Sequence, residues 1–230
     1  MKCLLRTAFE KISMLVNANF DDRIVIDTLK SNWVPSPVPG VERKLLDRLG
    51  AEEARATSIV GYAAGSSFTP HEHPLGEEFL VLSGVFSDEH GDYPAGTYVR
   101  NPPGSRHTAY SDKGCELFVK VRQFDVADSK RVVTDTPKAI FRQGLVPGLK
   151  VLPLHEFGTE HTALVQWAPG TKFQPHTHWG GEEIFVLEGV FSDEHGDYPA
   201  GTWIRSPHMS VHKPYSDVGC LIYVKVGHLV

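Results

Sequence analysis

The amino-acid sequence predicts an all-β protein made of two tandem β-barrels, with a short helical segment at the N-terminus. The first observation is an internal repeat, because the segment VFSDEHGDYPAGT at 85–97 recurs letter for letter at 190–202. From 71 to 121, 33 of 51 positions are identical to the residues 105 positions later, which indicates two copies of one structural unit. The second observation is a series of short β-type runs separated by glycine and proline turns.

The repeat also predicts the domain boundaries. Upstream of the conserved core the match is weaker, but residues 23–28 and 38–40 have counterparts 108 positions later. Each unit therefore begins shortly before the first of these blocks. The expected divisions are a leader at 1–20, a first domain at 21–128 and a second domain at 129–230.

The individual elements follow from local sequence patterns. Apolar residues at positions 4, 5, 8, 9, 12, 15 and 16 predict a short amphipathic helix in the leader. A second short helix is expected around 45–49. Runs rich in β-branched and aromatic residues predict strands, and Gly/Pro turns at about ten-residue spacing are typical of a sandwich or barrel. In the first unit these runs are 56–62, 78–82, 97–100 and 116–121.

Composition excludes several classes of function. The formal net charge is −5 and no basic run exceeds two residues, which argues against a nucleic-acid surface. No stretch of about 18 apolar residues is present, so we expect no membrane-spanning helix. Cys3, Cys115 and Cys220 form no CxxC pair, and their odd number gives no disulfide framework. We therefore expect reduced thiols in the cytoplasm, with Cys115 and Cys220 in the protein core.

One set of residues in the first unit has the spacing of a metal site. His71 and His73 are two residues apart, so an extended strand points both imidazoles to one face. Glu77 follows a Pro-Leu-Gly turn, and His107 can approach from another strand. Three imidazoles and one carboxylate suit zinc, iron, nickel, cobalt, copper or manganese, and not calcium or magnesium. On a six-coordinate metal, two positions would stay open for substrate, water or dioxygen.

The second unit repeats this set, so we expect one divalent transition metal in each domain. The four ligand-type residues are retained in both copies while their neighbours differ, which favours metal binding over chance. On the residues alone the choice of glutamate stays open, because Glu77 is followed by Glu78 in both copies. The second set is His176, His178, Glu182 and His212.

These motifs resemble the two cupin signatures. The first signature, Gly-x5-His-x-His-x3–4-Glu-x6-Gly, matches Gly65, His71, His73, Glu77 and Gly84. Its six-residue spacing to the last glycine selects Glu77 over Glu78, and likewise Glu182 over Glu183. The second signature matches Gly96, Pro102, Gly104 and His107. The resemblance implies a jelly-roll (double-stranded β-helix) barrel in each unit.

The second copy departs from this pattern in one loop. Met209 stands where the first copy has Gly104. We expect the loop to take a different path to His212, so the sequence predicts a metal less firmly at the second site than at the first.

Among cupins, the repeat is most similar to the cupin domain of ChrR-type anti-sigma factors, over some 200 residues. This resemblance implies zinc as the metal, with iron, nickel or manganese as alternatives, and a role in sensing oxidative signals such as singlet oxygen. In that family a separate N-terminal helical domain with its own His/Cys zinc site binds the sigma factor. Here no histidine precedes His71 and Cys3 is the only early cysteine, so we expect no sigma-binding module.

Three functional hypotheses remain. The first is a metal-binding bicupin with a sensing or regulatory role that binds a small molecule. The second is a metal-dependent dioxygenase or isomerase acting on a small chelating substrate, whose catalytic residues the sequence does not identify. The third is an interaction module in which the metal is structural. The chain is expected to be a monomer or a homodimer.

Two further residue pairs recur in both units. Arg100 and Arg205 precede the loop to the last histidine, and we consider a surface ion pair or a contact to a substrate carboxylate. His90 and His195 lie in the identical SDEHGDYPAG turn, and we expect them to be solvated turn residues.

Overall fold

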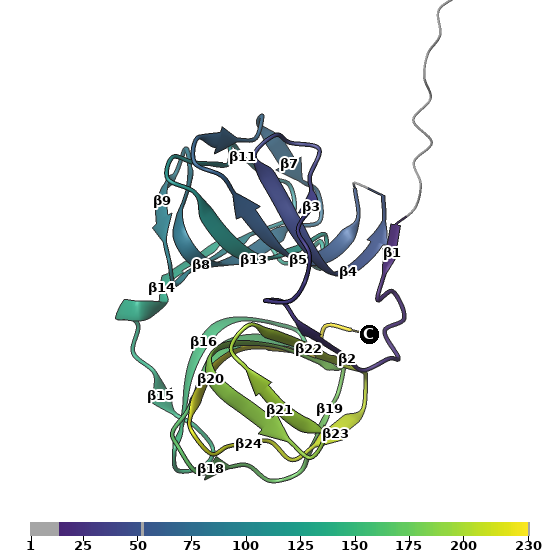
Figure 1. The fold of residues 1–230 in the computed structure, drawn as a ribbon, viewed down its shortest axis with the longest axis vertical. Coiled ribbons are helices and arrows are strands. Elements are labelled where there is room, and N and C mark those ends of the chain that lie inside the picture. Colours follow the sequence, from purple (N-terminus) through teal and green to yellow (C-terminus); the bar gives the residue numbers. More distant parts are fainter. Residues whose placement is uncertain (1–13, 52, 230) are drawn as a thin grey trace, which may run out of the picture.

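In a computed structural model, which describes residues 14–51 and 53–229, two β-barrels lie one against the other (Figure 1). Apart from a single turn of 3-10 helix, η1 (Thr136–Lys138), the described elements are strands. The predicted all-β fold with two tandem barrels is therefore confirmed. Among the described residues, no helix has the length and apolar character needed to cross a membrane.

The first barrel consists of β1 (Met14–Val16), β3 (Val34–Pro35), β4 (Val41–Gly50), β5 (Arg55–Tyr62), β6 (Ser66–Ser67), β7 (His71–His73), β8 (Glu77–Asp88), β9 (Gly91–Pro94), β10 (Thr97–Asn101), β11 (Ser105–His107), β12 (Tyr110–Ser111), β13 (Cys115–Val121) and β14 (Val132–Asp135). The path through its main sheet is β1-β4-β5-β13-β8-β10-β14. On β8 the side chains alternate: Phe79 and Val81 lie in the barrel interior, whereas Leu80 faces the second barrel. The sheet thus contributes to two separate cores.

The second barrel repeats this arrangement. It consists of β2 (Ile24–Asp27), β15 (Arg142–Gln143), β16 (Leu149–Phe157), β17 (Glu160–Trp167), β18 (Thr171–Lys172), β19 (His176–His178), β20 (Glu182–Asp193), β21 (Gly196–Pro199), β22 (Thr202–Ser206), β23 (Ser210–His212), β24 (Tyr215–Ser216) and β25 (Cys220–Val226). Its main sheet runs β15-β16-β17-β25-β20-β22-β2.

The two repeats exchange their first strands. β2, from the first repeat, pairs antiparallel with β22 of the second barrel, and β14, from the second repeat, pairs in the same way with β10 of the first. Matching hydrogen bonds end both exchanged strands, since Thr28 Oγ1 donates to the Gly201 carbonyl at 2.7 Å and Thr136 Oγ1 donates to the Gly96 carbonyl at 2.7 Å. Each barrel is therefore completed by the other repeat.

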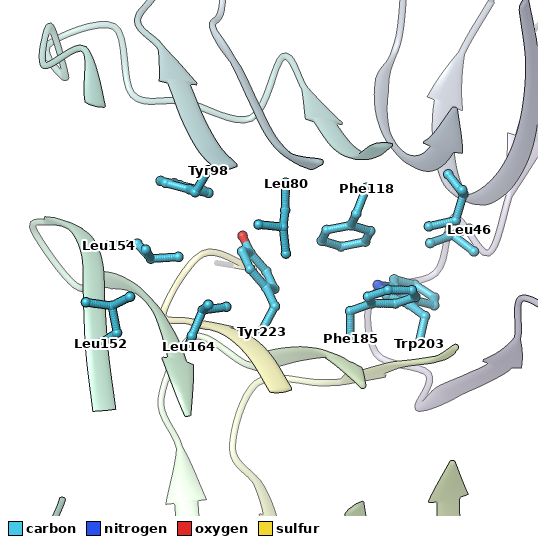
Figure 2. Packing of buried hydrophobic residues seen from close by; sticks show 11 residues of the cluster. Leu46, Leu80, Tyr98, Phe118, Leu152, Leu154, Leu164, Phe185, Trp203 and Tyr223 are labelled. Carbon is cyan, nitrogen blue, oxygen red and sulfur yellow. The ribbon is translucent and has the colours of Figure 1, made fainter. Parts of the chain in front are cut away.

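A shared hydrophobic core joins the barrels (Figure 2). The rings of Phe118 and Phe185 stack at its centre, with centroids 5.0 Å apart and planes 8° apart. Leu80 and Tyr98 approach from the first barrel, and Trp203 approaches from the second. Each barrel also has its own interior core, so the contact between the barrels is a third apolar core of the molecule.

Buried ion pairs lie beside the shared core. Lys225 Nζ contacts Glu78 Oε1 at 2.5 Å and Glu160 Oε1 at 2.7 Å. Lys120 pairs with Glu183 in the corresponding arrangement. All four of the residues Glu78, Lys120, Glu183 and Lys225 are 0–1% exposed. Burial by itself would raise the pKa of Glu78, but Lys225 and Arg100 outweigh it and lower this pKa to about 2.

The prediction of a helix around 45–49 is wrong, because these residues lie within strand β4. The cause is tertiary: β4 pairs with β5, inserts Leu46 into the shared core and lets Asp47 accept a hydrogen bond from the Thr57 amide at 2.9 Å. The predicted leader helix falls mainly on residues 1–13, which lie outside the described residues. Its last two positions, Leu15 and Val16, belong to strand β1 and are not helical.

Arg100 forms neither the surface ion pair nor the contact to a substrate carboxylate that the sequence suggested. This residue is 0% exposed, and its Nη2 contacts Asp128 Oδ2 at 2.7 Å and Glu160 Oε1 at 3.5 Å. Its guanidinium also lies over the Phe124 ring at 3.6 Å. Arg100 therefore belongs to the buried ion pairs between the barrels, and neither faces solvent nor lines a metal site.

Candidate metal centres

The first candidate centre is built on two short paired strands. β7 and β11 are antiparallel, with His71 opposite His107, so three imidazoles gather on the inner face of this pair. On β7 the intervening Glu72 is exposed while His73 is buried, as the alternation of a strand requires. The ring centroids of the three histidines lie 4.8–4.9 Å apart. The structure thus brings the three predicted histidines together.

Glu77 enters the same cluster at the start of β8. Its Oε2 lies 3.5 Å from His73 Nε2 and 3.6 Å from His107 Nε2, and the two imidazole nitrogens are 3.0 Å apart. The next residue, Glu78, points to the opposite face of β8 and pairs with Lys225. Strand alternation therefore places only Glu77 beside the histidines.

The second centre has nearly the same geometry. β19 pairs with β23 so that His176 lies opposite His212. Glu182 Oε2 is 3.6 Å from both His178 Nε2 and His212 Nε2. In this centre one ligand atom from each of the four predicted residues lies within 4.8 Å of the others. In the first centre the same holds for the ligand atoms of the three histidines.

The residues of the second centre fit a bound cation. His178 Nε2, His212 Nε2 and Glu182 Oε2 are buried and make no hydrogen bond. Buried polar atoms are rarely left in this way unless a ligand binds them. Burial raises the pKa of Glu182 to about 7, and burial lowers the pKa of His178 to about 3. A cation would favour both the ionised carboxylate and the neutral imidazole.

An aspartate behind each centre orients one histidine. Asp88 Oδ2 lies 3.3 Å from His107 Nδ1, while its Oδ1 accepts hydrogen bonds from the His90 amide and the Tyr93 hydroxyl. Such a partner keeps the proton on Nδ1, which leaves Nε2 as the ligand atom. Asp193 holds the same place beside His212, at 3.6 Å. These aspartates were missed by sequence analysis, although the identical turn in both repeats was the signal for them.

Arginines beside the exchanged strands reach Asp193 and Tyr93, the hydrogen-bond partner of Asp88, from the other repeat. Arg23, just before β2, contacts Asp193 Oδ2 at 3.1 Å and donates to the Tyr198 hydroxyl at 2.7 Å. In the first barrel Arg131, just before β14, donates to the Tyr93 hydroxyl at 3.0 Å. Each centre is therefore supported by an arginine from the opposite repeat.

The loop containing Met209 does not take a different path, so that prediction is wrong. Met209 N donates to the His178 carbonyl at 2.9 Å, as Gly104 N donates to the His73 carbonyl at 2.9 Å. Met209 has φ +61° and Gly104 has φ +78°. Met209 adopts the left-handed conformation that Gly104 has in the first copy. A methionine in place of glycine therefore adds backbone strain without displacing His212.

Met209→Gly is therefore expected to stabilise the second barrel by about 1 kcal/mol, because glycine adopts a positive φ without this penalty. The Met209 side chain is half exposed, so its removal sacrifices little buried surface. Urea unfolding followed by circular dichroism measures the change. Gly104→Ala is the matched reverse variant, since no heavy atom lies within 4 Å of an added Cβ there and only the backbone preference changes. Equal stability of all three proteins would contradict the prediction.

The cavities beside the two centres differ. The first is about 330 Å³ and reaches His71, His73 and Glu77, with arginines among its lining residues. The second is about 130 Å³, and apart from His176, Glu182 and His212 its described lining is apolar. The first centre is therefore the one with room for a polar small molecule.

The remaining candidate residues lie away from the centres. Cys115 and Cys220 are buried free thiols in the barrel cores, as expected. Burial raises the pKa of Cys220 to about 11, which disfavours the reactive thiolate. The side chains of His90 and His195 are exposed in their turns, also as expected.

The sequence matches the ChrR cupin-like domain family twice, at residues 21–125 and 129–230. The chain belongs to this family. Its two ChrR cupin-like domains correspond to the two repeats, which confirms the resemblance noted from the motifs. Comparison with curated proteins gave no match.

Solved structures show the same bicupin fold at low sequence identity. A protein of Nostoc punctiforme PCC 73102 described as a "putative dioxygenase" superposes with a TM-score of 0.75 at 15% identity, covering 90% of this chain and 82% of its own. A cupin 2 conserved barrel domain protein from Leptotrichia buccalis gives 0.63 at 12%, covering 93% and 99%. Oxalate decarboxylase from Lactobacillus farciminis gives 0.58 at 14%, covering 90% and 86%.

Proposed function

We propose that the protein binds one divalent transition metal in each barrel and uses the metal of the first barrel to bind a small molecule, in a sensing or regulatory role. The observation that carries this proposal is the difference between the cavities beside two otherwise matching ligand clusters. The first borders a cavity of about 330 Å³, and the second borders an apolar one of about 130 Å³. The second metal therefore suits a structural role.

The resemblance to ChrR-type cupins favours zinc, and the set of three imidazoles and one carboxylate also accepts iron, nickel or manganese. When bound, the metal would act as a Lewis acid toward an oxygen of the small molecule. The protein's own contribution is orientation. Asp88 holds the proton of His107 on Nδ1, so that Nε2 faces the centre, and Glu77 supplies one negative charge.

Elemental analysis of the purified protein tests metal binding. We expect about two metal equivalents per chain, because each barrel holds a complete ligand set. His73→Ala should remove the metal of the first barrel, His178→Ala that of the second, and the double variant both. His90→Ala is the matched control, since this exposed imidazole lies outside the clusters and should leave the content unchanged. Metal-free wild-type protein, or single variants with full metal content, would contradict the proposal.

A metal-dependent dioxygenase or isomerase is the second candidate function. It is favoured by the cavity of about 330 Å³ beside the first ligand cluster, and the similar structures include proteins described as a "putative dioxygenase" and an oxalate decarboxylase. Oxygen uptake by iron-loaded protein, given small chelating acids or diketones, distinguishes the candidates. Uptake that His73→Ala abolishes would establish the enzyme; metal-loaded protein that binds a small molecule without turnover supports the sensor.

A further inference from the structure

We infer that the ligand of the first barrel is a small organic carboxylate, bound jointly by the metal and by the guanidinium groups of Arg43 and Arg122. This inference rests on the proposed function, because it assumes a metal at His71, His73, Glu77 and His107. It goes further by naming the chemical class of the small molecule and the side chains that select it.

The arginines share one cavity with the metal ligands. Among the described residues that line it, Arg43 and Arg48 come from β4, and Arg122 directly follows β13. Much of the remaining lining is apolar, with Val60, Leu117 and similar side chains. A guanidinium presents a planar pair of donors that matches a carboxylate. The lining therefore suits a molecule with an anionic group and an apolar body.

The second barrel lacks these cations. Arg43 pairs with Val60 on β5, and at the same place in the second barrel Val151 pairs with Val165 on β17. Arg122 follows β13 where Gly227 follows β25. The basic groups are thus a property of the first cavity and not of the repeated fold.

Arg122 also occupies a backbone position that disfavours it. Its φ is +57°, and its amide donates to the Gly76 carbonyl at 3.0 Å. Gly227 has φ +77° and makes the equivalent bond to the Gly181 carbonyl at 3.1 Å. A non-glycine residue in this conformation costs free energy that glycine avoids. A strained arginine that lines a ligand cavity indicates a role for its side chain in binding.

The acidic residues Glu53 and Glu72, which line the same cavity, do not prevent Arg122 from binding a ligand carboxylate. Arg122 Nη2 contacts Glu53 Oε2 at 3.3 Å, but the Glu53 side chain is 75% exposed, so solvent weakens the pair. A ligand carboxylate can therefore replace Glu53 at Arg122. Glu72 lies on the outer, exposed side of β7. Arg48 is buried and donates to the Ala51 carbonyl, which fixes it in the wall.

Isothermal titration calorimetry of zinc-loaded protein tests the inference, with benzoate and hexanoate as carboxylate probes. Benzamide serves as the neutral control and phenylphosphonate as the alternative anion. We expect one carboxylate to bind per chain. Benzamide should bind at least about tenfold more weakly than benzoate, because it lacks the charged hydrogen-bond partner of the arginines. Arg122→Gly, which introduces the residue of the second repeat, should weaken carboxylate binding about tenfold or more, while metal content is kept and thermal stability is kept or raised, because glycine adopts this positive φ without a penalty. His90→Ala is the matched control: this exposed imidazole lies outside both ligand clusters, so the variant should leave carboxylate affinity unchanged.

The outcomes separate the two levels of the proposal. If the protein holds no metal, the proposed function itself fails. With full metal content, the inference is overturned when neither carboxylate binds, when benzamide binds as tightly, or when Arg122→Gly has no effect. Tighter binding of phenylphosphonate than of benzoate would indicate that the cavity binds phosphate-type anions, and would overturn the inference of a carboxylate ligand. Carboxylate binding that requires both the metal and Arg122 supports it.

Discussion

Lys225→Ala is expected to destabilise the folded protein by roughly 3–5 kcal/mol, the range typical of breaking a buried ion pair from one side. Lys225 is fully buried between Glu78 and Glu160, at 2.5 and 2.7 Å. Without its ammonium group, Glu78 keeps Arg100 at 4.0 Å as its remaining cation in this cluster. Urea unfolding followed by circular dichroism measures the loss.

Lys138→Ala is the matched control for this experiment. Lys138 contacts Asp135 at 2.6 Å, a distance similar to those at Lys225, but the Lys138 side chain is 84% exposed. An exposed pair of this kind contributes about 0–1 kcal/mol. Similar losses in the two variants would show that burial does not decide the effect. The double variant Lys225→Met, Glu78→Gln should recover part of the stability, because it removes both buried charges.

The fold class and the grouping of the three histidines in each unit follow from features that act over short distances. A strand repeats every two residues, so the HxH spacing placed His71 and His73 on one face wherever the strand lay. The internal repeat then required two such units. The choice between Glu77 and Glu78 needed the spacing of the cupin signature, because the sequence of β8 alone does not say which face meets the second barrel.

The exchange of first strands could not be predicted. The repeat shows that residues 23–28 and 131–136 are equivalent, but the strands they can join are also equivalent. β10 and β22 have related sequences, TYVRN and TWIRS, and offer the same hydrogen-bonding edge. The choice between the two barrels depends on the connecting segments and on the shared core, which are properties of the assembled chain.

Arg100 and Met209 were misjudged for a different reason. An arginine on a short strand is usually solvated, and Arg100 is buried because Asp128 of the connecting segment and Glu160 of the second barrel surround it. A non-glycine residue in a glycine position usually changes the loop, whereas here the retained hydrogen bond to the His178 carbonyl fixes Met209 in the strained conformation. Both cases are tertiary constraints that override local preference.

Separating the repeats is expected to abolish folding of each half as a monomer. A fragment of residues 14–128 lacks β14, so the edge of β10 loses its partner. It also exposes the shared core around Phe118 and removes Lys225, the cation that pairs with Glu78. Exposed apolar surface and an open sheet edge both oppose the monomer. Size-exclusion chromatography and urea unfolding measure the outcome.

A fragment of residues 14–139 is the matched comparison, because it differs by including β14. It should keep more strand structure than 14–128, yet still lack a cooperative transition, since the shared core remains open. Mixing 14–128 with 129–230 should restore a compact heterodimer, because each half then regains its exchanged strand and its ionic partners. A stable monomer of 14–128 with cooperative unfolding would show that the barrels are independent, and that neither the exchanged strands nor the buried ion pairs are needed to hold one barrel together.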